Sequence, residues 1–381
     1  MATDSGADLR IPQHLLPTDG RFGCGPSKVP AGAVARLAAA APLLLGTSHR
    51  QPPVRQLVGR LRAGLTELFS LPEGYEVALG NGGASLFWDL AALCLIERRS
   101  QHLSFGEFSS KFAQVVRAAP HLEEPEVIEA APGSLSRPRA TPEVDAYCLI
   151  HNETSTGVQA EVARVGAEGQ LVLVDGTSAA GGLPLDAGSI DAYYFSPQKC
   201  FASDGGLWVA ILSPAAIDRS ARLGGSGRWI PSSLDLNLAL QNSRQDQTYN
   251  TPAVATLFLF VEQLEWMLGQ GGLPWAAERC RESARIIYSW AESVPYASPF
   301  VEDRAARSQV VATIDLAPEV PAGAVSAVLR RHGIVDIDGY RKLGRNQLRV
   351  GLFPAVDPPD VAQLTHAIDW VAERIQEGYH A

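Results

Sequence analysis

The feature of this 381-residue sequence that most restricts its fold is an alternation of short apolar segments with helical patterns over the first two thirds of the chain. Each apolar segment ends in polar or glycine-rich residues, which is typical of buried strands in a mostly parallel sheet covered by helices. The candidate strands are residues 76–79, 146–150, 171–174, 192–195 and 208–212. We therefore expect an α/β fold here, with functional loops after the strands.

The pattern changes after a glycine cluster at residues 269–274, which interrupts a long helical stretch. It continues as helix, strand, helix, strand and helix, with the first of these strands expected at 309–316. We therefore expect residues 26–270 to form a large domain and residues 271–381 a smaller α/β domain. Residues 1–25 are expected to form an N-terminal segment that packs with the small domain.

The composition argues against several classes of function. The chain has 32 Lys+Arg and 41 Asp+Glu, and its formal charge of -9 argues against nucleic acid or an anionic membrane as the main partner. Its start resembles neither a secretory signal nor a membrane anchor, so we expect a cytoplasmic protein. The five cysteines include no C-x-x-C pair, which predicts reduced thiols and no metal site.

The segment DAYYFSPQKCFASDGGLWVAIL carries Lys199 shortly after a candidate strand. An amine at the end of a buried strand is partly desolvated, which lowers its pKa and makes it available as a Schiff-base nucleophile. For a lysine considered alone, a solvated surface position is the commoner interpretation. Lys199 becomes informative when it is considered together with the neighbouring motifs.

Asp175 directly follows the apolar segment LVLV, where a buried carboxylate faces the carboxyl edge of a sheet. Considered alone, it could equally be a helix N-cap. An aspartate that pairs with a heterocyclic nitrogen and a lysine that holds an aldehyde would together bind pyridoxal phosphate. The glycine-rich segment GNGGAS precedes a helical pattern, so its backbone N–H groups could bind a phosphate, although a plain tight turn is an alternative.

The chain as a whole resembles the phosphoserine aminotransferases, class-V members of the fold-type I pyridoxal-phosphate enzymes, and in particular their actinobacterial branch. The resemblance extends from RFGCGPSKVP and GTSHRQPPVRQLVGRLR through GNGGAS, FGEFSSKFA, HNETSTGV, VDGTSAAGG, YYFSPQKCFASDGG and TYNTPA to GYRKLGRNQLRVGLFPA. It implies a large domain with a mostly parallel seven-stranded sheet and a smaller C-terminal α/β domain. It also implies a homodimer whose active sites are shared across the interface.

The resemblance implies pyridoxal 5′-phosphate as the cofactor and assigns residues to it. Lys199 would form the Schiff base, Asp175 would pair with the ring nitrogen, and Phe108 would stack on the ring. The other implied contacts are Thr154 to the phenolic oxygen, Gly83, Ala84 and Ser85 to the phosphate through backbone N–H groups, Gln198 through its side chain, and Asn250 and Thr251 to the phosphate from the neighbouring subunit.

The implied reaction transfers the amino group of L-glutamate to 3-phosphohydroxypyruvate and gives O-phosphoserine and 2-oxoglutarate. This reaction belongs to serine biosynthesis, and the family also acts in pyridoxine biosynthesis on 4-phosphohydroxythreonine. Arg349 would bind the α-carboxylate, because a guanidinium binds a carboxylate through two parallel hydrogen bonds. His49 and Arg50 would bind the substrate phosphate or the distal carboxylate of glutamate across the interface. Arg341 would lie near the same group.

Three residues depart from the common family pattern. Tyr340, which precedes Arg341, stands where many members carry histidine, Cys24 where serine is usual, and Cys200 where asparagine is common. Cysteine desulfurases share this fold and need a nucleophilic thiol on a mobile loop. A thiol adjoining Lys199 does not meet that need.

Two other functions were weighed against this interpretation. Another small aminotransferase, such as an alanine–glyoxylate type, would not need the cluster of His49, Arg50 and Arg341. A catalytically silent cofactor-binding protein would tolerate the loss of Asp175 or Lys199, and the presence of both residues argues against it.

Overall fold

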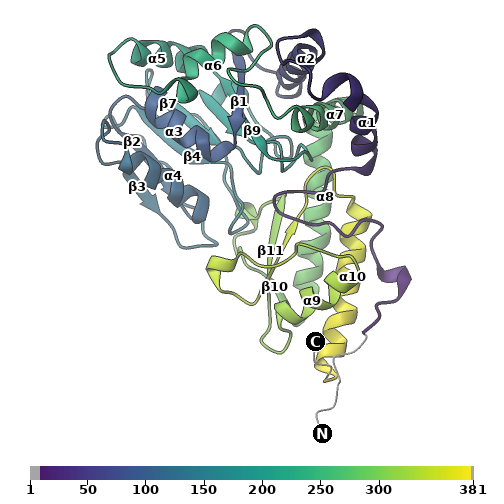
Figure 1. The fold of residues 1–381 in the computed structure, drawn as a ribbon. Coiled ribbons are helices and arrows are strands. Elements are labelled where there is room, and N and C mark those ends of the chain that lie inside the picture. The colour runs from purple at the N-terminus through teal and green to yellow at the C-terminus, as the bar shows by residue number, and fades with distance from the viewer. Residues whose placement is uncertain (1–8, 379–381) are drawn as a thin grey trace.

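The computed structural model describes residues 9–378. Figure 1 shows an upper part built around a large sheet and a lower part that contains β10, β11, α9 and α10, with the long helix α8 connecting the two. The helices are α1 (Ala31–Leu44), α2 (Pro52–Leu68), α3 (Ala84–Cys94), α4 (Glu107–Ala118), α5 (Pro214–Gly224), α6 (Leu236–Ser243), α7 (Val254–Gln270), α8 (Gly272–Ser293), α9 (Ala322–Arg331) and α10 (Pro358–Gln376). The strands are β1 (Glu76–Gly82), β2 (Ser100–Ser104), β3 (Glu126–Glu129), β4 (Ala146–Ile150), β5 (Asn152–Glu153), β6 (Val158–Gln159), β7 (Leu171–Asp175), β8 (Ala192–Phe195), β9 (Gly206–Leu212), β10 (Ala297–Pro299), β11 (Val311–Leu316) and β12 (Gln347–Gly351).

The large sheet confirms the predicted α/β architecture. Over the described residues it has seven strands in the order β1-β9-β8-β7-β4-β2-β3, and β9 alone runs antiparallel to its neighbours. The five candidate strands correspond to β1, β4, β7, β8 and β9. The sequence analysis missed β2 and β3, because the sequences SQHLS and EVIE lack a continuous apolar run.

The two faces of the sheet are buried against different helices. Along β7, Val172 and Val174 belong to a core that includes α2 and α7, whereas Leu171 and Leu173 belong to a core that includes α3, α4 and α6. Because successive side chains of a strand alternate between faces, Asp175 continues the row of Leu171 and Leu173. Its carboxylate therefore lies on the face that α3 covers.

The lower part contains a three-stranded antiparallel sheet in the order β10-β11-β12. Its core includes residues of α8, α9 and α10 together with Ile11 and Phe22 of the N-terminal segment. Gly351 N donates to Phe22 O (2.7 Å), and Thr18 N donates to the Asp360 carboxylate (2.7 Å). Ile11, Thr18 and Phe22 thus contact the part with the small sheet, while residues 1–8 of the predicted segment lie outside the described residues.

Helix α8 belongs to both cores. Leu273 near its start packs with the large sheet, and Ile287 in its second half packs with the small sheet. The helical break predicted at 269–274 is present, since α7 ends at Gln270 and α8 begins at Gly272. The domain boundary at residue 270 stays a prediction. None of the helices within residues 9–378 is both long enough and apolar enough to cross a membrane.

Candidate active site

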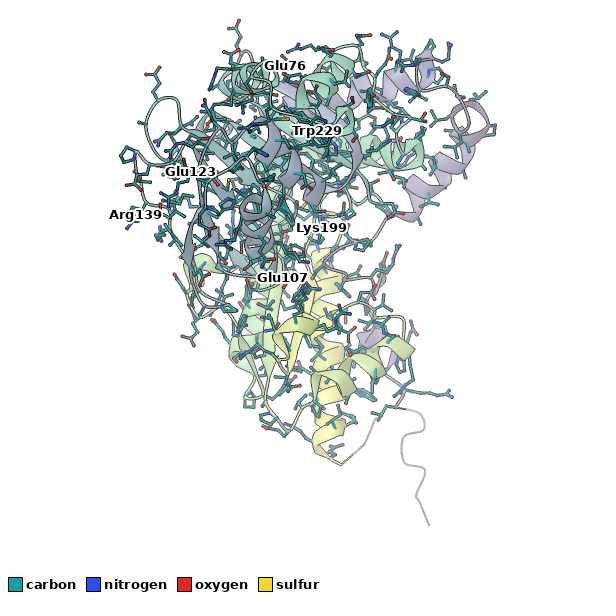
Figure 2. The ribbon with its side chains drawn as sticks, turned by 60° about the vertical axis from the view of Figure 1, so that its left-hand side comes forward. Glu76, Glu107, Glu123, Arg139, Lys199 and Trp229 are labelled. Atoms are coloured by element: carbon teal, nitrogen blue, oxygen red, sulfur yellow. The ribbon has the colours of Figure 1, made fainter. Side chains whose placement is uncertain are left out.

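A cavity of about 470 Å³ lies at the carboxyl ends of β7 and β8 and at the start of α3. The carboxyl edge of a parallel sheet is the usual place for a ligand in such folds. The predicted site residues that line this cavity are Gly83, Ala84, Ser85, Phe108, Thr154, Asp175, Gln198 and Lys199. In Figure 2, Lys199 lies near the level where the upper and lower parts of the molecule meet.

Lys199 is buried, with 8% of its surface exposed. Burial lowers the pKa of its amine from 10.5 to about 8, so a substantial fraction of the amine is neutral near physiological pH. Its Nζ donates to the backbone carbonyl of Cys24 at 2.5 Å. A Cβ on Gly25 would overlap the end of the Lys199 side chain, and Gly25 also has φ +134°. The Cys24–Gly25 backbone is therefore shaped around this amine.

Asp175 is 4% exposed, and both of its carboxylate oxygens accept hydrogen bonds. Its Oδ1 accepts from Thr177 N (2.9 Å) and Thr177 Oγ1 (2.5 Å), and its Oδ2 accepts from Trp88 Nε1 (3.0 Å). Burial raises the pKa of Asp175, whereas these hydrogen bonds and the nearby charge of Lys199 lower it. The structure thus holds a carboxylate on one wall of the cavity that contains a desolvated amine.

The start of α3 forms another wall of the cavity. Its N-cap is Gly83, and no side chain caps the first turn. Because the first N–H groups of a helix have no partner within the helix, this turn offers donors to an anion. The glycine-rich segment therefore opens a helix, as the sequence predicts, and does so next to Lys199 and Asp175.

Phe108 and Thr154 are held by a shared buried carboxylate. Glu153 accepts from the backbone N–H groups of Phe108 (3.1 Å) and Ser109 (2.9 Å), and from Ser155 Oγ (2.6 Å). Burial raises the pKa of Glu153, and these donors lower it. Glu153 therefore fixes the first turn of α4, which carries Phe108, against the segment that carries Thr154.

Arg349 lies in a neighbouring cavity of about 460 Å³, which shares Gly25 with the first one. Its Nη1 donates to Thr154 O (3.1 Å), while its buried Nε has no partner. The guanidinium carbon lies 5.1 Å from the ring centre of Tyr340, and that ring lies 6.2 Å from the ring of Phe108. Arg341 lines the same cavity. This cavity therefore offers cationic donors beside the lysine site.

His49, Arg50, Asn250 and Thr251 gather elsewhere, and none of them lines either cavity. Thr251 Oγ1 and His49 Nδ1 are 3.1 Å apart, and Arg50 Nη1 donates to a nearby glutamine. Thr251 O accepts from Asn81 Nδ2 (2.6 Å) in β1. Within one chain, the predicted site residues therefore form two groups.

Several residues of the site were not expected from the sequence. Trp88, Asn152 and Thr177 line the first cavity, and Glu153 holds the loop and helix behind it. Asn152 and Thr177 are close in sequence to Thr154 and Asp175, which was an available signal. Trp88 is four residues after Ala84, so it lies on the same face of α3. Glu153 gave no signal for its contact with α4, because Phe108 and Ser109 lie 45 and 44 residues away in the chain.

The two unusual cysteines are also explained by their surroundings. Cys24 contributes its backbone carbonyl to Lys199, so its side chain does not decide that contact. Burial raises the pKa of the Cys24 thiol and that of the Cys200 thiol. Cys200 Sγ contacts Ser178 O at 3.5 Å and does not line the cavity that contains Lys199. Neither thiol is prepared as a nucleophile.

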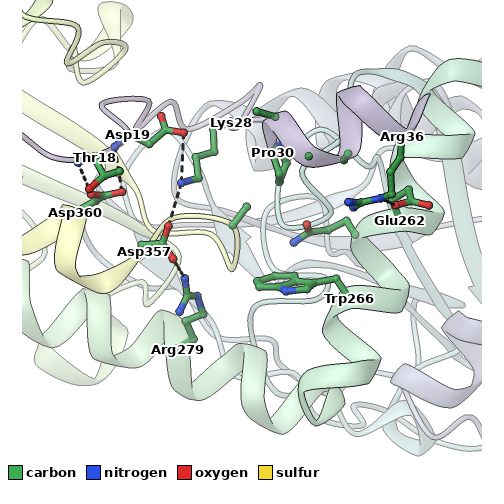
Figure 3. A pocket seen from close by; sticks show the side chains of 15 residues that line it. Thr18, Asp19, Lys28, Pro30, Arg36, Glu262, Trp266, Arg279, Asp357 and Asp360 are labelled. Atoms are coloured by element: carbon green, nitrogen blue, oxygen red, sulfur yellow. Dashed lines mark hydrogen bonds and ion pairs between the residues drawn. The ribbon is translucent and has the colours of Figure 1, made fainter. Parts of the chain in front are cut away.

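A further cavity of about 500 Å³ lies between the N-terminal segment, α1, α7, α8 and the start of α10 (Figure 3). Most of its charged side chains form ion pairs: Lys28 with Asp19 (3.6 Å) and Asp357 (3.4 Å), Arg36 with Glu262, and Arg279 with Asp357. None of the predicted site residues lines it. In residues 9–378, no group of three or more His, Cys, Asp or Glu side chains could hold a metal ion.

Comparison with known proteins relates this geometry to a family. A family model described as Aminotransferase class-V matches residues 135–342. A phosphoserine aminotransferase of Nocardioides sp. is 58% identical over 370 residues, which cover 96% of this chain and 99% of that protein. The solved structure of a phosphoserine aminotransferase from Cytophaga hutchinsonii is similar with a TM-score of 0.85 and 26% identity, covering 92% of this chain and 99% of that one. The structure of a PLP-bound phosphoserine aminotransferase from Trichomonas vaginalis shares the fold, with a TM-score of 0.75 and 19% identity, covering 92% and 99%.

Proposed function

Because this chain belongs to the phosphoserine aminotransferases of the class-V aminotransferase family, we propose that it transfers the amino group of L-glutamate to 3-phosphohydroxypyruvate. The products are O-phosphoserine and 2-oxoglutarate, and the transfer is reversible. The observation that carries this proposal is a buried amine and a buried carboxylate in one cavity, next to a cavity that contains Arg349 and Arg341. Such a pair suits the cofactor, and the arginines suit an anionic substrate.

Pyridoxal 5′-phosphate is the cofactor of this aminotransferase, and the cavity fits it. The volume of about 470 Å³ lies within the range of about 300–1,000 Å³ for small-molecule sites. The buried Oε1 of Gln198 and Oδ1 of Asn152 have no partner in the protein, so a ligand with polar groups would satisfy them. The cofactor, when bound, supplies an electron-accepting ring that stabilises negative charge at the substrate α-carbon.

The residues of the cavity have distinct proposed roles in holding the cofactor. Lys199 holds the aldehyde carbon, Asp175 accepts from the ring nitrogen, and Phe108 stacks on the ring. The first turn of α3 binds the phosphate, with Gln198 adding a side-chain contact. Thr154 donates to the phenolic oxygen. These assignments are supported by the shared cavity and by the burial of Lys199 and Asp175.

Lys199 also has a proposed role in proton transfer. With glutamate bound, the Nζ atom of Lys199 would remove the proton from the α-carbon of glutamate. In the second half of the cycle it returns a proton to the α-carbon of the product. A pKa of about 8 suits both tasks, because an acid–base group works best when its pKa is near the operating pH.

Arg349 is the proposed anchor of the substrate α-carboxylate. Its Nη1 is already directed to Thr154 O, while the buried Nε lacks a partner. An unpaired buried guanidinium N–H is costly, and a carboxylate would remove that cost through a charge-assisted hydrogen bond. Arg341 in the same cavity is the proposed partner of the distal anionic group.

The proposed active form is a homodimer in which His49, Arg50, Asn250 and Thr251 serve the cavity of the other subunit. Two observations support this. These residues lie outside the cavity of their own chain, and the Nε2 atom of His49 is buried without a partner. Near His49 and Arg50 in sequence, Leu43 and Leu45 are 80% and 44% exposed, and neighbouring exposed apolar side chains are suited to a protein contact.

Activity assays test this function directly. The purified protein is supplied with L-glutamate and 3-phosphohydroxypyruvate, and O-phosphoserine is measured. In parallel, alanine and glyoxylate are supplied as the alternative pair. The proposal expects rapid product formation from the first pair only. Equal or faster transfer between alanine and glyoxylate would contradict it. The cytoplasmic compartment and a role in pyridoxine biosynthesis stay predictions.

A further inference from the structure

We propose that Trp88 is a positioning residue for the cofactor, and that its indole N–H keeps the Asp175 carboxylate oriented and ionised for the ring nitrogen. The proposal rests on the cofactor site of the proposed function, although not on the identity of the substrate. Trp88 lines the cavity, and its Nε1 donates to Asp175 Oδ2 at 3.0 Å.

The two oxygens of Asp175 are held from different elements. Thr177, two residues later in the chain, donates twice to Oδ1, while Trp88 of α3 donates to Oδ2. A carboxylate held at one oxygen can rotate about its Cβ–Cγ bond, whereas one held at both oxygens has a fixed plane. Trp88 therefore supplies the contact that sets the orientation of the carboxylate.

The indole is itself fixed in place. Trp88 is 6% exposed and stacks on Phe112 of α4 with ring centres 6.0 Å apart and an interplanar angle of 17°. It lies one turn after Ala84, at the start of the same helix. Because α3 also offers its first N–H groups to the phosphate, one rigid helix would hold both the phosphate and the partner of the ring nitrogen.

The electrostatic surroundings make this donor important. Burial favours the neutral form of Asp175, whereas the ionised form is the stronger acceptor for a protonated ring nitrogen and stabilises its positive charge. The charged side chain that shifts the pKa of Asp175 is Lys199, which favours the ionised carboxylate. Tyr194, the register partner of Asp175 on β8, has its pKa raised well above the usual value by burial and stays neutral. Trp88 and Thr177 then remain as donors that do not titrate.

The test compares Trp88→Phe with Trp208→Phe, in which a buried tryptophan of the same core but outside the cavity is changed. Both variants keep an aromatic ring and lose a similar volume, whereas Trp88→Phe alone removes a donor to Asp175. The dissociation constant of pyridoxal phosphate is measured by titrating the cofactor-free proteins. We expect an increase of about tenfold or more for Trp88→Phe and less than about twofold for Trp208→Phe.

A spectroscopic readout separates positioning from general loosening of the fold. With 15N in the cofactor ring, Trp88→Phe should move the ring-nitrogen resonance toward that of unprotonated pyridine, because a more basic Asp175 takes a larger share of the proton. In an Asp175→Asn background, Trp88→Phe should have no further effect on either readout.

The proposal is overturned if the resonance is unchanged in Trp88→Phe, or if the loss of affinity persists in the Asp175→Asn background. An equal loss in Trp208→Phe would also overturn it. Because none of these readouts involves a substrate, they stand even if the protein fails to act on 3-phosphohydroxypyruvate. A failure of the proposed function is thus distinguishable from a failure of this inference.

Discussion

The lysine cavity and the His49–Thr251 group differ in how complete they are within one chain. Lys199 and Asp175 are buried, and their pKa values are displaced from the ordinary ones. Lys199 donates to Cys24 O, and Asp175 accepts from Thr177 and Trp88. His49 and Thr251 contact each other outside the cavity, and His49 keeps an unpaired ring nitrogen. A desolvated amine or carboxylate, such as that of Lys199 or Asp175, needs the packed surroundings that one folded chain supplies here. Recognition of an anion can be divided between two chains, because arginine and histidine donors work near a surface.

The largest expected loss of activity comes from removing the amine of Lys199. Lys199→Ala should lower kcat by about 10³-fold or more, because both the covalent hold on the cofactor and the proton transfer are lost. The measurement is turnover with glutamate and 3-phosphohydroxypyruvate. The control is Lys28→Ala, another buried lysine that lines only the cavity between α1 and α10. Normal turnover by Lys199→Ala would remove this residue from its assigned role.

A second change tests whether Arg349 anchors the substrate carboxylate. Arg349→Lys keeps the charge but loses the fork of N–H donors, so kcat/KM should fall about 100-fold for both glutamate and 3-phosphohydroxypyruvate. The dissociation constant of the cofactor should stay unchanged, since Arg349 lies in the neighbouring cavity. A loss confined to one of the two substrates would contradict a shared carboxylate anchor.

A third change tests whether the active site is shared between two chains. Arg50→Ala should lower kcat/KM about tenfold or more through the loss of an anion contact. If Arg50 serves the other subunit, a mixed dimer of Arg50→Ala and Lys199→Ala chains contains one intact site. Random mixing should then restore about a quarter of normal activity. Activity no higher than the average of the two parent variants would contradict the shared site.

The smallest expected effect concerns the pKa of Lys199. A neutral amine is needed to capture the cofactor, and burial lowers this pKa to about 8. The capture rate of the cofactor-free protein should therefore rise only about threefold from pH 7.5 to 8.5 and level off above pH 9. Stopped-flow absorbance measures this rate. A tenfold rise per pH unit up to pH 10 would mean that the amine has an ordinary pKa.

The strands around the lysine cavity were also the part of the fold that could be predicted most fully from the sequence. Apolar runs marked β4, β7 and β8, and polar residues at their ends marked Asp175 and Lys199. The polar strand β2 carried no such signal, because its Ser100 and His102 are buried through contact with each other at 3.0 Å. A contact of that kind becomes visible only when the neighbouring chain segments are in place.

The position of the His49–Thr251 group relative to the cavity could not be predicted from patterns in one sequence. His49 and Arg50 were identified through family resemblance, and no periodicity indicates which subunit they serve. Trp88 and Glu153 were missed for a different reason. Their roles depend on hydrogen bonds to residues 87 and 44 positions away in the chain, to Asp175 and Ser109 respectively. Such pairs follow from the way helices pack on the sheet, which local spacing does not encode.

In the proposed mechanism, the cavity of Lys199 serves both halves of the amino transfer. The most direct measurement is the absorption spectrum of the cofactor-loaded protein, recorded before and after L-glutamate and again after 3-phosphohydroxypyruvate. We predict that glutamate shifts the cofactor band to that of the aminated cofactor and that 3-phosphohydroxypyruvate restores the original band. A band that responds to glutamate but is not restored by 3-phosphohydroxypyruvate would contradict the proposed substrate.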